Sequence, residues 1–86
     1  MDYKPVESSQ IAEVGYDAET ETLGIKFQPT RKQKDAGQPG SEYHYSSVEP
    51  DTHVALVTAE SVGKYFGQFI KANPSQYLYK KIEPGA

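Results

Sequence analysis

Two tyrosines, Tyr43 and Tyr45, are the residues of this sequence best suited to binding chemistry. They stand two positions apart, so a strand over this segment places both rings on one of its faces. Such a pair can stack successive bases of a single-stranded nucleic acid, at about 1–3 kcal/mol per base. The same spacing can instead bury both rings in a small core. We favour this second interpretation, because a short chain needs every large apolar side chain for its core.

The basic residues fall into two blocks of the sequence, separated by acidic blocks. All charged residues are lysine or arginine in residues 26–34 and in residues 61–82. If the two blocks meet in the fold, they form a positive surface on a chain whose net charge is -3, and such a surface can bind a phosphate backbone. An ordinary solvated surface is the alternative. The residues considered for RNA binding are Tyr43 and Tyr45 with Arg31, Lys32, Lys34, Lys64, Lys71, Lys80 and Lys81.

The sequence offers little catalytic or metal-binding chemistry. His44 and His53 are the only histidines and cysteine is absent, whereas a zinc site needs at least three protein ligands. The segment 61–64 has the lysine of a phosphate loop but lacks the upstream glycine and the Ser/Thr after the lysine, so a helix N-cap explains it better. Ser8 and Ser9 could act as nucleophiles only with a base placed beside them, and the sequence nominates none. We predict no metal, no cofactor and no enzyme activity.

Length and composition predict one small domain. A chain of 86 residues has room for a single core, and we expect one domain over residues 1–86 with its core at about 5–82. The absence of cysteine fits a reducing, cytoplasmic location. No apolar stretch approaches the roughly 20 residues that cross a bilayer, and no signal peptide is recognised. We expect no membrane association, and a monomer is favoured.

The apolar pattern predicts an α+β fold, an antiparallel three-stranded meander with two helices packed on one face. Its strands are expected at Ser9 to Tyr16, Thr22 to Phe27 and Glu42 to Val48. Residues Tyr77 to Ile82 should form an extended tail or a short fourth strand. Glycine and proline without apolar periodicity predict a mobile, disordered loop from Gln28 to Gly40.

Two helices follow the third predicted strand. Pro50 suits the first position of one helix, and Ser61 is a good N-cap for the other, which should end before Pro74. Gly63 and Gly67 lie one helical turn apart, which suggests that another segment packs closely against both. The predicted core consists of Val14, Leu23, Ile25, Phe27, Tyr45, Val54, Val57, Val62, Phe66, Phe69 and Ile70.

Several segments occur here in a recognisable order and spacing. They are Val14-Gly15-Tyr16-Asp17, Leu23-Gly24-Ile25-Lys26-Phe27, Tyr43-His44-Tyr45, Val48-Glu49-Pro50 and Ala59-Glu60-Ser61-Val62-Gly63-Lys64-Tyr65-Phe66. From about Pro5 to Tyr77 the chain resembles the KTSC domain, a family named for its occurrence at the C-terminus of some lysyl-tRNA synthetases. One departure is an insertion at 28–41, where family members turn within a few residues.

The resemblance implies this fold and, through the synthetase association, a role in RNA binding. We therefore expect a small non-enzymatic binding module of KTSC type that binds RNA weakly through its basic patches. The alternative is a protein–protein adaptor, or a small regulator that docks on a larger assembly, to which an acidic balance is better suited.

Overall fold

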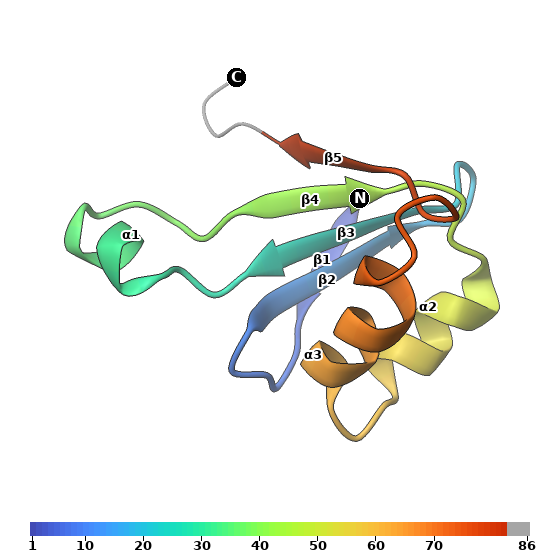
Figure 1. The fold of residues 1–86 in the computed structure, drawn as a ribbon, viewed down its shortest axis with the longest axis horizontal. Helices are drawn as coiled ribbons and strands as arrows, with labels where there is room; N and C mark the ends of the chain where they lie inside the picture. The colour runs from blue at the N-terminus through green and yellow to red at the C-terminus, as the bar shows by residue number, and fades with distance from the viewer. Residues whose placement is uncertain (83–86) are drawn as a thin grey trace.

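A computed structural model describes residues 1–82, which form a five-stranded antiparallel sheet with helices on one face (Figure 1). Each strand pairs with the next along the chain, so the strand order is β1-β2-β3-β4-β5. The α+β class is therefore as predicted. The strands are β1 (Asp2–Pro5), β2 (Ile11–Asp17), β3 (Thr22–Phe27), β4 (Glu42–Tyr45) and β5 (Tyr79–Ile82).

The predicted three-stranded meander is the centre of a wider sheet. The expected short fourth strand is present as β5, whereas β1 was not predicted, because its sequence has no apolar alternation and contains a proline. The first predicted strand begins later, at Ile11, after the Ser8 hydroxyl accepts hydrogen bonds from two backbone N–H groups. The third ends earlier, since Ser47 has a φ of 59° and Val48 turns inward to donate to the Glu21 carbonyl at 2.8 Å.

The segment between β3 and β4 contains a short helix, α1 (Arg31–Asp35), so the prediction of a structureless loop is wrong. Thr30 caps this helix, and the Gln33 side chain bonds back to the Thr30 backbone in a capping box. The base of the segment is tied to the sheet by a hydrogen bond from Phe27 N–H to the Ser41 carbonyl, at 2.8 Å. Local hydrogen bonds order a segment that has no apolar residues to bury.

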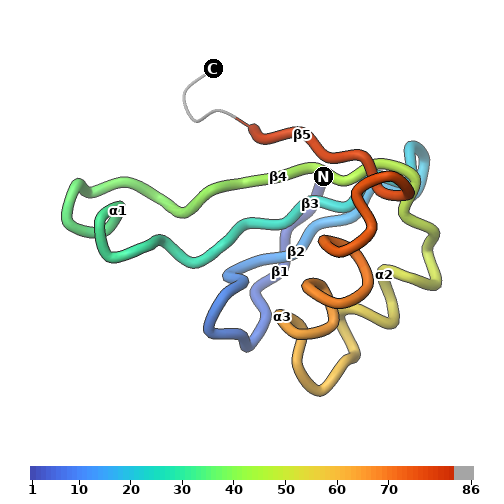
Figure 2. Tube along the Cα trace, viewed as in Figure 1, coloured from blue at the N-terminus to red at the C-terminus, as the bar shows by residue number. Residues whose placement is uncertain are grey.

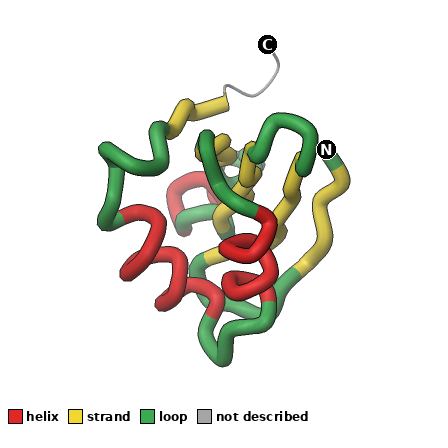
Figure 3. The backbone as a smooth tube through the Cα atoms, turned by 90° about the vertical axis from the view of Figure 1, so that its right-hand side faces the viewer, coloured by secondary structure: helices red, strands yellow, loops and turns green. Residues whose placement is uncertain are grey.

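Two helical segments cover one face of the sheet (Figures 1 and 3). Helix α2 (Pro50–Val57) begins at a proline, as predicted. Helix α3 (Val62–Tyr65) is capped by the Ser61 hydroxyl and continues into a π-helical segment, η1 (Phe66–Lys71) (Figure 2). A π-helix has i→i+5 hydrogen bonds and therefore wider turns than an α-helix. This spacing changes which side chains of the segment point to the core.

Three residues predicted to lie in the core are exposed instead: Val54 (55% exposed), Val57 (37%) and Phe69 (52%). Helix α2 buries only Leu56. In α3 and η1 the buried side chains recur every four residues, so Phe69 turns towards solvent. Phe27 is only partly buried. The buried hydrophobic core consists of Ile11, Val14, Leu23, Ile25, Tyr45, Val48, Leu56, Val62, Phe66, Ile70 and Tyr77.

The two helical glycines have different surroundings. A Cβ atom on Gly63 would lie 3.0 Å from the Ser8 hydroxyl oxygen and 3.2 Å from the side-chain oxygen of Gln10, so the predicted close approach is confirmed there. A Cβ atom on Gly67 would have no neighbour within 4 Å. The prediction for Gly67 is wrong, because this residue lies on the solvent side of the helical segment.

Candidate functional site: an aromatic groove

Two rows of side chains cross the helix-covered face of the sheet. The register aligns Val14, Ile25, Tyr43 and Lys81 in one row, and Tyr16, Leu23, Tyr45 and Tyr79 in the other. From β3 to β5 the exposed fraction of the side chains rises along each row: in the second, Leu23 is fully buried, Tyr45 is 5% exposed and Tyr79 is 59% exposed. The helices therefore leave the β4–β5 end of this face open, and the tyrosines lie at that end.

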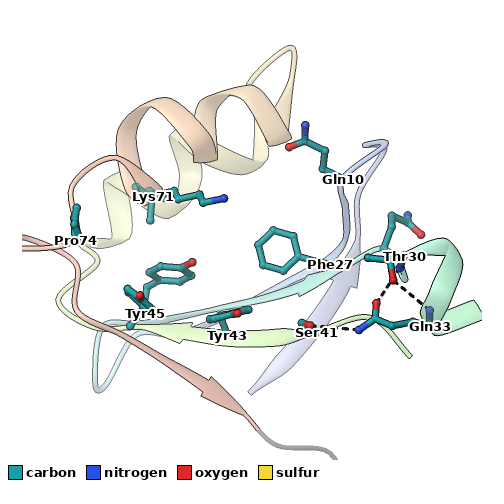
Figure 4. A pocket seen from close by; sticks show the side chains of 12 residues that line it. Gln10, Phe27, Thr30, Gln33, Ser41, Tyr43, Tyr45, Lys71 and Pro74 are labelled. Carbon is teal, nitrogen blue, oxygen red and sulfur yellow. Dashed lines mark hydrogen bonds between the residues drawn. The ribbon is translucent and has the colours of Figure 1, made fainter. Parts of the chain in front are cut away.

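A groove of about 540 Å³ lies over this open end (Figure 4). A volume of this size is typical of small-ligand sites, at about 300–1,000 Å³. Its aromatic part is formed by Phe27, Tyr43, Tyr45 and Tyr79, and its helical wall by Ile70, Lys71 and Pro74. Polar side chains line the other end, from Gln10, Gln28, Thr30, Gln33 and Ser41.

The tyrosine rings form one continuous surface. The ring centroids of Tyr43 and Tyr45 are 6.4 Å apart, and the Tyr79 ring lies 6.0 Å from the first and 5.8 Å from the second. Phe27 meets Tyr43 edge-on at 5.7 Å, and Phe66 supports Tyr45 from the core at 5.3 Å. These separations fall in the range of favourable aromatic pairs, about 4.5–7 Å, so the rings hold one another in place.

Tyr45 keeps its proton at neutral pH. Burial first, and then the neighbouring Tyr43 and Tyr79, raise the pKa of its phenol to about 12. A phenol in this state can donate or accept a hydrogen bond but is not an activated nucleophile. The aromatic part of the groove is therefore suited to holding a ligand rather than to attacking one.

Helix α1 builds the polar end of the groove. The Gln33 side-chain oxygen accepts from Thr30 N–H at 2.8 Å, while its amide nitrogen donates to the Ser41 hydroxyl at 3.5 Å (Figure 4). The segment between β3 and β4 is thus fastened across the end of β4, and the Gln33 amide lines the groove. The sequence contained a signal for this helix, the Thr-x-x-Gln spacing of a capping box, which the glycine and proline content concealed.

The structure brings only some of the candidate basic residues to the tyrosines. Lys71 lines the groove, and its side chain extends over the space between Tyr45 and Phe27 (Figure 4). The register places Lys81 beside Tyr43 on the same face, whereas Lys80 pairs with His44 on the opposite face. Four others are exposed and outside the lining of the groove: Arg31, Lys32 and Lys34 on α1, and Lys64 on α3.

A polar cluster occupies the other, helix-free face. The Tyr3 hydroxyl donates to a Glu42 carboxylate oxygen at 2.7 Å, and His44 Nε2 lies 3.1 Å from the same oxygen. Burial and the Glu42 contact raise the pKa of Tyr3, and the hydrogen bond from Tyr3 lowers the pKa of Glu42. A tyrosine held in its protonated form is a poor nucleophile. The cluster fastens β1 across the sheet.

The part of the chain that the structure describes, residues 1–82, holds no group of three or more His, Asp or Glu side chains that could bind a metal ion. In the same residues, no helix is long and apolar enough to cross a membrane. The groove itself was missed by the sequence patterns. Its lining comes from β3, α1, β4, η1, β5 and the loops beside them, and no local spacing connects these segments.

The fold and the groove define a small α+β domain with an aromatic, ligand-sized site beside an open sheet edge. The chain belongs to the KTSC domain family, whose model matches residues 7–77. It is similar to the crystal structure of a KTSC domain protein from Yersinia pestis, with a TM-score of 0.74 and 33% identity, covering 95% of this chain and 97% of that one.

Two sequence relatives match most of the chain. An uncharacterised protein from Stutzerimonas stutzeri is 32% identical over 78 residues, covering 91% of this chain and 93% of its own. A protein from Tsukamurella paurometabola is 32% identical over 68 residues, covering 79% of this chain and 87% of its own. Neither relative's description names an enzymatic activity. Strands β1 and β5 lie outside the matched residues 7–77.

Proposed function

We propose that this domain is a non-enzymatic binding module whose aromatic groove holds single-stranded RNA. The observation that carries the proposal is the ring surface of Tyr43 and Tyr79, supported by the buried Tyr45, with Lys71 extended above it. Every base has an aromatic face, so stacking on tyrosine tolerates any sequence and contributes about 1–3 kcal/mol per base. A duplex hides these faces, so the groove would accept only an unpaired base.

Charge and polarity along the groove support the same ligand. Lys71 and Lys81 lie at the tyrosines, where they would meet the phosphates next to a stacked base. The amide of Gln33, at the other end, can pair with the edge of a base. Helix α1 lies beyond that end. Its basic side chains would contact an RNA strand that continues past the groove; they are Arg31, Lys32 and Lys34.

This arrangement changes the expected salt dependence. Lys64 lies outside the lining of the groove and Lys80 on the opposite face of the sheet, so the phosphate path we propose includes neither of them. For a strand confined to the groove, with two phosphate contacts at Lys71 and Lys81, the logarithm of the affinity should fall with the logarithm of salt at a slope of about -1.4. The binding we propose is therefore led by stacking, with a smaller contribution from the backbone.

Fluorescence anisotropy with a labelled, unstructured RNA hexamer tests the proposal. Tyr79 is exposed, so Tyr79→Ala should spare the fold and weaken binding about tenfold. Lys71→Gln should weaken binding and reduce the salt slope by about 0.7. Lys64→Gln removes the same charge outside the groove and should leave both the affinity and the slope unchanged, which makes it the matched control.

Three outcomes would contradict RNA binding at the groove. One is the absence of any binding at low salt. Another is an equal loss for Lys64→Gln and Lys71→Gln, which would mean diffuse attraction to the whole surface. The third is tighter binding to a duplex than to the single strand, because a duplex offers no free base to the tyrosines.

A further inference from the structure

Strand β5 leaves one edge of the sheet open within residues 1–82. It is the last strand in the sheet order, pairs on one side with β4, and has no described strand on its other side. Its residues Tyr79, Lys80 and Lys81 are exposed. An open edge carries unpaired N–H and C=O groups that another extended chain can use.

The hydrogen-bond pattern shows which backbone groups face outward. Ser46 N–H donates to the Leu78 carbonyl at 2.8 Å, one register step before the pair Tyr45–Tyr79. Hydrogen-bonded and non-bonded pairs alternate in an antiparallel ladder, so Lys80 bonds to β4 while Tyr79 and Lys81 do not. The outward N–H and C=O groups therefore belong to Tyr79 and Lys81, the two residues whose side chains lie on the groove face.

The charge of this edge selects its partner. Lys80 and Lys81 point to opposite faces of the strand, so the edge is positive on both faces, and Tyr79–Ile82 contains no acidic residue. Glu42, the carboxylate paired across from Ile82, is already bonded to Tyr3 and His44. Two copies of β5 placed edge to edge would bring lysine against lysine, which opposes self-pairing.

We propose that the β5 edge binds an acidic, extended segment of a partner protein as a sixth, antiparallel strand. The register sets its chemistry: carboxylates lie opposite Lys80 and Lys81, and a β-branched or aromatic residue lies opposite Tyr79. From its N-terminus to its C-terminus, the added strand therefore has an acidic residue opposite Lys81, an acidic residue opposite Lys80 and an apolar residue opposite Tyr79. Lys81 is shared with the proposed RNA contacts, but strand addition uses outward backbone groups, whereas RNA binding uses the ring surfaces of the groove.

A synthetic peptide, acetyl-Gly-Thr-Glu-Glu-Val-Thr-Gly-amide, tests the proposal with the intact chain. In amide hydrogen exchange followed by NMR, saturating peptide should slow the Tyr79 and Lys81 amides by about tenfold or more, since each gains a hydrogen bond. The Lys80 amide, already bonded to β4, serves as the internal reference and should change much less. The same peptide with lysine in place of both glutamates should not bind.

Backbone methylation of the peptide separates strand addition from simple charge attraction. A methyl group on the valine nitrogen, which faces β5, should weaken binding about tenfold or more. A methyl group on the nitrogen of the second glutamate, which faces away, should have little effect. On the protein, Lys81→Pro removes an outward N–H and should weaken binding more than Lys81→Gln, which removes only the charge; circular dichroism checks that both variants fold.

The proposal is overturned if the two methylated peptides bind equally, or if the Tyr79 and Lys81 amides are not protected at saturation. It also fails if no binding occurs at millimolar peptide. Protection of these amides by the RNA hexamer alone, or by rising protein concentration without peptide, would assign the edge to nucleic acid or to a second copy instead. The methylated peptides keep the test decisive even if Lys81→Pro does not fold.

Discussion

The two faces of the sheet use the same strands in opposite ways. On β3, Leu23 and Ile25 point to the helix-covered face and are fully buried, while Gly24 and Lys26 point to the helix-free face. The covered face is held by the packing of large side chains. On the helix-free face, called the open face below, one cross-strand row runs from Tyr3 across Gly15 and Gly24 to His44. Two of its four residues are glycines, which have no side chain.

The glycines on the open face make room for a side chain from the edge strand. A Cβ atom on Gly15 would lie 2.9 Å from Met1 Cγ and 3.1 Å from the Tyr3 ring, and one on Gly24 would overlap the Tyr3 hydroxyl. The Tyr3 side chain occupies this gap together with Met1, with Lys26 Nζ 4.2 Å from the Tyr3 ring centroid and Glu42 bonded to the Tyr3 hydroxyl. One side chain thus fastens the outer strand to the centre of the sheet, whereas the covered face needs a whole core.

The largest test of this contrast compares two tyrosines of one row. Tyr45→Ala removes a buried ring that packs on Phe66, and it should lower the free energy of unfolding by about 3–5 kcal/mol, as large aromatic truncations do. Tyr79→Ala, its exposed neighbour, should change it by less than about 0.5 kcal/mol. Urea denaturation measures both. Equal losses would mean that the open end of the groove is part of the core.

A smaller effect is expected on the open face. Gly24→Ala should displace Tyr3 and break its hydrogen bond to Glu42, at a cost of about 1 kcal/mol. In the Tyr3→Ala background the same substitution should cost less, because the Tyr3 ring is gone and only the flexible Met1 side chain still has to move. A double-mutant cycle by urea denaturation measures the coupling. Purely additive losses would show that Gly24 is not there to accommodate Tyr3.

Gly67→Ala should stabilise the domain, although the sequence alone predicts the opposite. The space around Gly67 is open, so the added methyl group meets nothing, and alanine is favoured over glycine within a helix by up to about 1 kcal/mol. Gly63→Ala is the matched comparison. Its added Cβ atom would lie 3.0 Å from the Ser8 hydroxyl oxygen, so this substitution should stabilise the domain less than Gly67→Ala does. A lower thermal midpoint for Gly67→Ala would contradict the exposed position of this residue.

The smallest effect concerns His53, which stacks on Tyr16 at a centroid distance of 4.5 Å. Burial, and then the charge of Lys4, lower the pKa of His53. As the pH falls, His53 takes up a proton at about pH 6.5 in the unfolded chain and only at lower pH in the folded chain. The free energy of unfolding therefore decreases as the pH drops below about 6.5. Thermal midpoints at about pH 8 and pH 5.5 should differ less in His53→Gln. An unchanged difference would assign the loss to other groups.

The local sequence determined much of the fold. Alternating apolar residues located β3 and most of β2 and β4, and the helix starts at Pro50 and Ser61 followed from capping chemistry. These features depend on hydrogen bonds and side-chain directions within a few residues. The family resemblance, now shown by the match over residues 7–77, rests on the same segments. Seven of the eleven predicted core residues are fully in the core.

Only the tertiary structure decided what each face meets. Periodicity placed Phe66 and Phe69 on one side of a helix, but the π-helical turn and the sheet beneath it bury the first and expose the second. Strand β1 has no pattern of its own, and it is held by pairing with β2 and by Tyr3 reaching Glu42, 39 positions away. The groove and the open β5 edge also depend on the tertiary structure, because residues distant in the chain become neighbours only when the strands pair into the sheet.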